Sequence, residues 1–417
     1  MNKLLYWIWL SLACTPGSPT FGRLIGAFAD AKDIYDASES EIRRTVGSRV
    51  SDCTALANKE LGRAKEILEF CLTKKVGIVT YADENFPESL RRIPTPPVLL
   101  YYRGVLPDFK RYFGCAIVGT RSLTNYGRTN AFKLGYDMAS AGATVVSGMA
   151  VGIDGVAHAG ALAAGGVTVA VLGSGIDVCY PSDHVTLARG IVKNGCVMTE
   201  YAPGTKPLRY NFPCRNRLIS GLCTATAVVE GREKSGSRST AKHAEEQGRA
   251  VYAFPGNIGS ETSQLTNLLI KNGARLCTGA DDIVRDFERE SGGVLNPFNL
   301  RVTSEVNMSE VLSEYRVSCV TSSDNIFRAP RQRREKREEK PEVKRAEQTN
   351  DSAVEELPFF DKSQLDIYKR IPRENECTIE SLVCAEYSLS RVMSILLRLE
   401  MGNFIVMLPG DRVKRNI

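Results

Sequence analysis

Histidine is scarce in this 417-residue chain, and none of its twelve cysteines belongs to a C-x-x-C pair. With only three histidines and irregular cysteine spacings, the sequence lacks the ligand pattern of a zinc site, and we expect no metal. Several cysteines fall inside apolar runs such as "GCAIVG" and "GCVMTEY", where a small buried thiol is the common interpretation. Scattered cysteines in a chain of this size favour reduced thiols and a cytoplasmic location.

Long apolar runs are also missing, because no segment after the opening residues approaches the ~18 uninterrupted apolar residues of a membrane span. We therefore expect no contact with a membrane. The opening "MNKLLYWIWLSLACTPGS" has two interpretations, since a lysine, an apolar run and small residues also make up a signal peptide. We favour a first core helix, because apolar residues continue at helical spacing through Leu24, Ile25, Phe28 and Ile34.

A strong overall charge is absent as well, since the formal net charge is only +6. The segment from Arg328 to Glu347 alone holds nine Lys or Arg against five Glu, a surplus of four. The rest of the chain is nearly neutral. Any nucleic-acid site must therefore be built from charges that the fold brings together locally.

Several nucleotide-binding and catalytic signatures do not occur. In "AIVGTRSLTNYG", Gly119 is followed by Thr120 and Arg121 instead of the second glycine of G-x-G-x-x-G. The chain also has no G-x-S-x-G, H-E-x-x-H or G-x-x-x-x-G-K-[ST] motif. We expect no cofactor and no catalytic residues. His158 could act as a general base, but a packing role on its predicted helix is favoured.

Residues 76–290 have the alternation of an α/β domain. Apolar runs, from "CAIVGT" through "ATVVSG", "VTVAVLG", "CVMTEY", "ATAVVEG" and "AVYAFPG" to "ARLCTG", alternate with helical stretches of about 10 to 14 residues. Such strands belong to a parallel sheet covered on both faces, so we predict an extended Rossmann-like, doubly wound core. Two β-like runs between prolines at its start, in "VGIVTYADENFPESLRRIPTPPVLLYYRG", suit an extension at the sheet edge.

The flanking regions differ in composition. Residues 1–75 predict a small helical module of the SAM or helix-hairpin-helix kind, and the charged residues 291–355 predict a disordered linker. Residues 356–417 have the outline of a winged helix, with a second helix over Tyr387–Met401 and a hairpin that turns at "PGDR".

The loops that follow the strands should meet at the carboxyl edge of the sheet. Glycines and serines just before predicted helices offer backbone N–H groups for a phosphate, although tight-turn packing explains any single one equally well. These candidate ligand residues are Gly119, Thr120 and Arg121 in the first loop, and Ser147, Gly148, Gly173, Gly175, Ser235 and Gly236 in the later ones.

The stretch "RYNFPCRNR" adds basic and aromatic side chains at the same edge. Flat aromatic faces stack bases and cations pair with phosphates, which suits single-stranded nucleic acid. The alternative is that an arginine of this stretch forms an ion pair with Glu200 or Glu230. The candidate residues here are Lys206, Tyr210, Phe212, Arg215, Asn216 and Arg217.

Taken together, the motifs "AIVGTR", "SGMAVGIDGVAH", "LGSGIDVCYP", "FPCRNRLISGL", "VVEG", "SGSRSTAKHAEEQGR", "FPG" and "NLLIKNGA" resemble in order and spacing those of the DNA-processing protein A family, also called DprA or Smf. The resemblance implies a Rossmann-like core that binds single-stranded DNA, forms a homodimer and delivers the strand to a RecA-type recombinase in natural transformation. Residue by residue, it implies DNA-binding roles for Arg121, for Lys206 and for the "RNR" segment 215–217. Threonine stands before Arg121 where serine is commoner in the family.

Two other functions were considered. Lysine-decarboxylase-like nucleotide-hydrolysing enzymes share this fold and have the signature P-G-G-x-G-T-x-x-E. In this chain "SGSRSTAKHA" lacks that glutamate, which argues against hydrolysis and for a protein that is not an enzyme. In the second alternative, the winged helix binds duplex DNA and the core is an assembly platform.

Overall fold

The computed structural model describes residues 3–47, 50–300, 306–318, 320–321, 362–372, 376–383, 387, 392–393, 395–396, 399–400, 405–408 and 412–415. The chain divides into two compact units, Met1–Gln332 and Arg333–Ile417. No helix in these ranges is both long enough and apolar enough to span a membrane.

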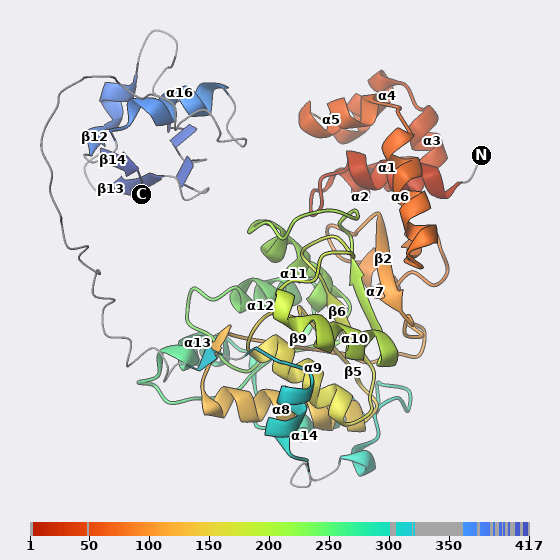
Figure 1. The fold of residues 1–417 in the computed structure, drawn as a ribbon, viewed down its shortest axis with the longest axis vertical. Coiled ribbons are helices and arrows are strands. Elements are labelled where there is room, and N and C mark those ends of the chain that lie inside the picture. The colour runs from red at the N-terminus through yellow and green to blue at the C-terminus, as the bar shows by residue number, and fades with distance from the viewer. Residues whose placement is uncertain are drawn as a thin grey trace, which may run out of the picture. The chain divides into compact units, whose positions relative to one another are not determined.

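Helices precede the sheet at the start of the first unit (Figure 1). The predicted first core helix is α1, which buries both tryptophans of the chain, Trp7 and Trp9. The apolar spacing that continues through Leu24 and Ile34 belongs to two helices, because the Asp30 carboxylate accepts the Ala31 N–H at 2.6 Å and caps a new helix there. The six helices are α1 (Leu4–Ala13), α2 (Thr20–Ala27), α3 (Ala31–Asp36), α4 (Glu39–Val46), α5 (Val50–Ala57) and α6 (Gly62–Thr73).

Nine strands of the described residues form one sheet, in the order β1-β2-β7-β6-β5-β3-β8-β9-β10. All seven predicted strands are present and run parallel, and the two runs before them extend the sheet at one edge, as predicted. The structure shows that these two edge strands pair antiparallel. The strands are β1 (Gly77–Thr80), β2 (Leu99–Gly104), β3 (Gly114–Val118), β5 (Thr144–Ser147), β6 (Thr168–Val171), β7 (Cys196–Thr199), β8 (Ala225–Val228), β9 (Ala250–Ala253) and β10 (Arg275–Leu276).

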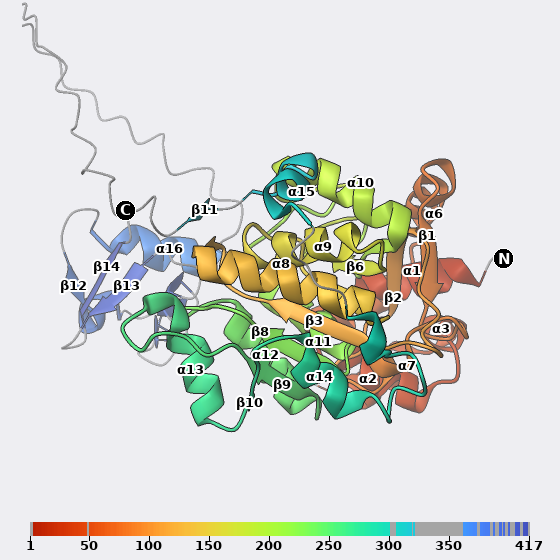
Figure 2. The same ribbon diagram turned by 90° about the horizontal axis from the view of Figure 1, so that it is seen from below.

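Every residue of the central strands β3, β5, β6, β7 and β8 is buried, which explains why these strands are continuously apolar. Cys115 and Ile117 pack against α8, α9 and α14, whereas Ala116 and Val118 pack against α7, α11, α12 and α13. Figure 2 shows α8 and α9 on one side of β3, and α11 and α12 on the other. The covering helices are α7 (Glu88–Arg91), α8 (Asn125–Ser140), α9 (Ile153–Ala163), α10 (Val185–Asn194), α11 (Asn211–Gly221), α12 (Ser237–Glu246), α13 (Gln264–Lys271) and α14 (Ala280–Phe287), with short 3-10 helices η1 (Ser182–His184), η2 (Glu261–Ser263) and η3 (Pro297–Asn299).

The sheet order reverses between β3 and β8. The chain goes from β3 through β5 and β6 to β7 on one side, and then returns to place β8 and β9 on the other. The connections that leave β3 and β8 therefore enter helices on opposite faces. In open α/β sheets, ligands bind in the crevice at this point, outside the carboxyl ends of the strands.

The disordered linker predicted over residues 291–355 is wrong for its first part. Residues 306–321 fold onto the core through α15 (Met308–Glu314), which packs on α9, and β11 (Val320–Thr321), which pairs with β4 (Ser122–Leu123). The polar composition gave no sign of this docking, because α15 has a single buried apolar side chain, Leu312. The part of the predicted linker from residue 322 to residue 355 lies outside the described residues.

The second unit is small, and its described strands form an antiparallel sheet in the order β12-β14-β13. Its core includes Ile367, Leu382, Ile405 and Val413. The predicted hairpin is present, whereas the predicted helix over Tyr387–Met401 falls largely outside the described residues. The elements are α16 (Lys362–Arg370), β12 (Cys377–Thr378), η6 (Ile379–Leu382), β13 (Ile405–Leu408) and β14 (Arg412–Arg415).

His158 lies in the core, where the packing interpretation places it. Its Nδ1 lies 2.7 Å from the Thr168 hydroxyl, which itself donates to the Val145 carbonyl, so Nδ1 carries the proton and donates. Its Nε2 is buried with no hydrogen-bond partner among the described residues. Burial, with His184 and Arg215 nearby, lowers the pKa of His158 to about 3.

The free energy of unfolding is expected to fall as the pH drops below ~6.5, the usual histidine pKa. Below that pH His158 binds a proton in the unfolded chain but stays neutral in the folded protein. This group should therefore lower the free energy of unfolding by about 1.4 kcal/mol for each pH unit of acidification. Urea unfolding between about pH 7 and 5 would measure the slope. His158→Asn, which can still donate to Thr168, should flatten it, leaving the contribution of His184, whose pKa burial also lowers. An unchanged slope in His158→Asn would contradict this assignment.

Candidate functional site

The loop after β3 carries an exposed arginine, Arg121, beside residues that are fixed by hydrogen bonds. The Thr120 N–H donates to the Glu230 carbonyl at 2.8 Å, and the buried Glu230 carboxylate accepts the Thr124 N–H and hydroxyl at 2.9 and 2.6 Å. These contacts tie the β3 loop to the end of β8, at the point where the sheet order reverses. Arg121 is exposed beside them and forms no ion pair within the described ranges.

Phe212 lies beside two guanidinium groups. The Arg121 guanidinium is 5.5 Å from the centroid of the Phe212 ring, and that of Arg215 is 5.8 Å from it. The Tyr180 ring packs against the same phenylalanine at 5.5 Å, tilted by 42°. Phe212 is half-buried, whereas Tyr180 is 41% exposed. An aromatic group flanked by a free cation is what a stacked base and its phosphate require.

The loop before α11 adds further cations. Lys206 and Arg209 are exposed and have no ion-pair partner in the part of the chain that the structure describes, and the Tyr210 ring is 71% exposed. Asn211 fixes this loop, because its amide donates to the carbonyls of Gly173 at 2.9 Å and Lys206 at 3.3 Å. The loops after β6 and β7 are thus joined beside Phe212.

Arg215 is not the exposed phosphate ligand that we expected. It is only 4% exposed, and its guanidinium donates to the carbonyls of Val171 and Gly148, the latter at 3.2 Å. Burial lowers its pKa to about 10, although the attraction of Asp154 opposes that shift. Arg215 therefore links the carboxyl ends of β5 and β6. Its contact with the site is the one between its guanidinium and the Phe212 ring.

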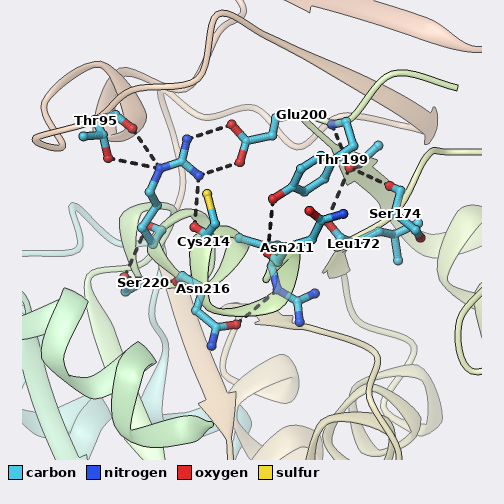
Figure 3. Close-up of polar contacts among 12 residues, drawn as sticks. Thr95, Leu172, Ser174, Thr199, Glu200, Asn211, Cys214, Asn216 and Ser220 are labelled. Atoms are coloured by element: carbon cyan, nitrogen blue, oxygen red, sulfur yellow. Dashed lines mark hydrogen bonds and ion pairs between the residues drawn. The ribbon is translucent and has the colours of Figure 1, made fainter. Parts of the chain in front are cut away.

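Arg217 is also wrong as a free cation at the sheet edge. It is 3% exposed, and its two terminal nitrogens donate to the two Glu200 oxygens at 2.5 and 2.7 Å (Figure 3). Its Nε donates to the Thr95 carbonyl at 3.0 Å. Burial alone would lower the pKa of Arg217, but Glu200 outweighs it and raises the pKa above its ordinary value. The ion-pair alternative named for this stretch is the observed arrangement.

Most of the candidate glycines are required by protein contacts. A Cβ at any of four of them would come within 3 Å of a neighbouring group, at 2.6 Å for Gly119 and Gly148, 2.8 Å for Gly175 and 2.9 Å for Gly173. At Gly148 the neighbours are Arg215 and Asp154, and at Gly173 the neighbour is Phe212. These glycines let the site side chains approach the strand ends, so packing accounts for them without a ligand.

The remaining candidates are divided between core and surface. The buried Ser147 hydroxyl donates to the Ile117 carbonyl at 2.6 Å, so it is a core residue. Asn216 is 8% exposed and donates to the carbonyl of Gly236 at 3.3 Å, which holds the loop before α12. Gly236 is exposed with no heavy atom within 4 Å of an added Cβ, and Ser235 is half-buried. The structure brings neither residue into contact with the Arg121 loop.

Four residues of the site are not predicted from the sequence, namely Tyr180, Asn211, Asp154 and Glu230. Glu230 is predicted only as a possible ion-pair partner. Each lies inside a stretch already singled out, such as "SGMAVGIDGVAH" or "VVEG". For Glu230 the available signal was an acid close behind an apolar strand, because a buried polar group there must pair with a neighbouring loop.

A family model described as DNA recombination-mediator protein A matches residues 77–288. A DNA processing protein DprA from Streptococcus pneumoniae is 40% identical over 206 residues, which cover 49% of this chain and 72% of that protein. A putative DNA processing protein DprA from Mycobacterium tuberculosis is 35% identical over 290 residues, which cover 67% of this chain and 73% of that protein.

The X-ray structure of DNA processing protein A from S. pneumoniae has a similar fold. It aligns with a TM-score of 0.60 at 30% identity and covers 69% of this chain and 98% of that one. The family model spans every loop of the site and ends before α15.

Proposed function

Because the chain belongs to the DNA recombination-mediator protein A family, we propose that it binds single-stranded DNA at the carboxyl edge of its sheet. The observation that carries this proposal is the Phe212 ring beside the free Arg121 guanidinium, 5.5 Å away. Lys206 and Arg209 lie on a loop joined to the same site through Asn211. In a duplex the bases are paired and stacked on each other, so this arrangement favours a single strand.

The finer parts of the proposal rest on family membership. The protein would form a homodimer through its Rossmann-like core and deliver the strand to a RecA-type recombinase, as in natural transformation. It would act in the cytoplasm and would not be an enzyme. His243, which stands where the signature of nucleotide-hydrolysing relatives of this fold has glutamate, has its Nδ1 3.4 Å from the Glu246 carboxylate, an arrangement that supports a structural role for it on α12.

One experiment tests the proposal against its enzymatic rival. Affinity for single-stranded and duplex DNA of the same sequence would be measured at two salt concentrations, beside an assay for release of base from a nucleoside monophosphate. Preference for the single strand without base release supports the proposal. Base release would favour the nucleotide-hydrolysing alternative, and equal affinity for both DNA forms would favour a duplex-binding second unit.

The salt dependence should be moderate. With Arg215 and Arg217 buried, the exposed cations on the loops after β3, β7 and β8 that have no ion pair in the described ranges are Arg121, Lys206, Arg209 and Lys234. Three to four phosphate contacts at about 0.7 each predict that log affinity falls with log salt at a slope of about −2 to −3. A titration of a short single strand at several salt concentrations measures it. A slope near zero would contradict phosphate binding at these residues.

A further inference from the structure

A second basic groove lies between the starts of α8 and α10 and the docked segment 306–321. It encloses about 950 Å³, near the upper end of the ~300–1,000 Å³ typical of ligand sites. Arg128 lines it from the first turn of α8, Arg189 from α10, and Arg316 from the turn between α15 and β11. Figure 2 shows α15 and α10 side by side above α9.

The charge of this groove is unbalanced. Arg128, Arg189 and Arg316 form no ion pair with any described residue, and the Nε of Arg128 is buried without a hydrogen-bond partner there. Asp183 is the one acidic residue among those that line the groove, and its carboxylate accepts the Ser318 hydroxyl at 3.3 Å. Three guanidinium groups against one carboxylate favour a polyanionic ligand.

Two connections join this groove to the Arg121 site. β4 begins directly after Arg121 and pairs with β11, with Ser122 opposite Val320. On the other side, the Tyr180 ring contacts Phe212 and is followed two residues later by Ser182, which lines the groove. Both connections are short, so the groove lies beside the Arg121 site.

The wall made by residues 306–321 is held firmly, although it lies outside the family match of residues 77–288. The Ser318 N–H donates to Nε2 of the buried His184 at 3.0 Å, and the Gly152 N–H donates to the Ser318 carbonyl at 3.1 Å. His184 in turn donates through Nδ1 to the Met149 carbonyl at 3.0 Å. Arg316 is thus carried by an extension that is anchored to the loop after β5.

We propose that this groove binds the phosphate backbone of the same single strand, beyond the nucleotides held at Arg121. The inference rests on the proposed function and extends its site. A flexible polyanion fits an open groove lined by arginines and short hydroxyl side chains, and backbone contacts of this kind do not read sequence. The groove should therefore lengthen the binding site without adding base preference.

The test compares full-length wild type with the double variant Arg189→Ala/Arg316→Ala on two oligonucleotides. Since single-strand sites span about 4–16 nucleotides, one strand should be about 5 nucleotides long and the other about 20. The variant should bind the long strand about tenfold more weakly, with the salt slope reduced by about 1.4 for two lost contacts. Its affinity for the short strand should not change.

The matched control is Arg111→Ala/Arg289→Ala, which removes two exposed arginines from the opposite edge of the sheet. Arg111 precedes β3, and Arg289 follows α14, whose Phe287 ring packs on Phe113 at 5.4 Å. This control should bind both strands like the wild type. Thermal unfolding of both double variants checks that each is folded.

The outcomes separate the two proposals. If the groove variant binds the long strand like the wild type, or loses affinity equally for both lengths, the extended path is wrong while binding at Arg121 stands. If the wild type binds neither strand, the proposed function fails and this inference with it. If inorganic phosphate stabilises the wild type but not the groove variant, and the affinity for long strands is unaffected, the groove is a small-anion site and the proposal is wrong.

Discussion

Replacing Arg217 with Ala is expected to lower the free energy of unfolding by about 3–5 kcal/mol, because the Glu200 carboxylate is left buried without its partner. The two side chains are 4% and 5% exposed and joined by two charge-assisted hydrogen bonds. Removal of the guanidinium also leaves the Thr95 carbonyl without its donor. Urea unfolding followed by circular dichroism measures the loss.

Two further variants make this test specific. Arg43→Ala removes an exposed arginine from its i,i+4 pair with Glu39 and should leave the free energy of unfolding nearly unchanged, because water screens such a pair. The double variant Arg217→Met/Glu200→Leu should recover much of the loss, since it leaves no unpaired buried charge. If Arg217→Ala is as stable as the wild type but binds DNA weakly, the guanidinium faces the ligand and the observed ion pair is not structural.

The sheet could be predicted from the sequence because its strands are buried on both faces. A strand such as β3, with all five residues buried, must be apolar throughout, and the next helix must return the chain to the start of the sheet. The crevice at the carboxyl edge follows from the same topology. Arg121 could be placed there because it comes directly after β3 and before any helix.

The roles of Arg215 and Arg217 could not be predicted in the same way. The residue types of "RYNFPCRNR" favour a loop, but α11 begins at Asn211, so both arginines lie in a helix. Which partners they meet depends on how that helix packs, and the partner of Arg217 lies 17 residues earlier in the chain. Composition alone cannot distinguish an arginine that pairs with a buried carboxylate from one that is free to bind a phosphate.

Residues 306–321 were assigned to a disordered linker for a related reason. The segment has few apolar side chains, so its hydrophobicity resembles that of a disordered chain. Its docking depends instead on backbone groups, namely the Ser318 N–H and carbonyl and the two-residue pairing of β11 with β4. Backbone groups form hydrogen bonds whatever the side chain, so such contacts can hardly be predicted from the sequence.

Replacing Arg121 with Ala should weaken single-strand binding by about 10- to 150-fold, which corresponds to about 1.5–3 kcal/mol. Two interactions of the Arg121 guanidinium are lost: its contact with a phosphate and its cation–π contact with the Phe212 ring. A cation–π contact at an exposed site contributes about 0.5–1 kcal/mol. Arg121→Lys should recover only part of the affinity, because an ammonium group keeps the charge but not the flat surface that stacks on an aromatic ring.

Folding should survive Arg121→Ala because the side chain is exposed, and base preference should survive because backbone contacts carry no sequence information. Thermal unfolding and competition between strands of different base composition measure the two properties. Arg111→Ala, which removes an exposed arginine at the opposite edge, is the matched control and should bind like the wild type. If Arg121→Ala binds single strands normally while Arg111→Ala does not, DNA is held at the amino edge of the sheet, and the Phe212 cluster serves only to pack the loops together.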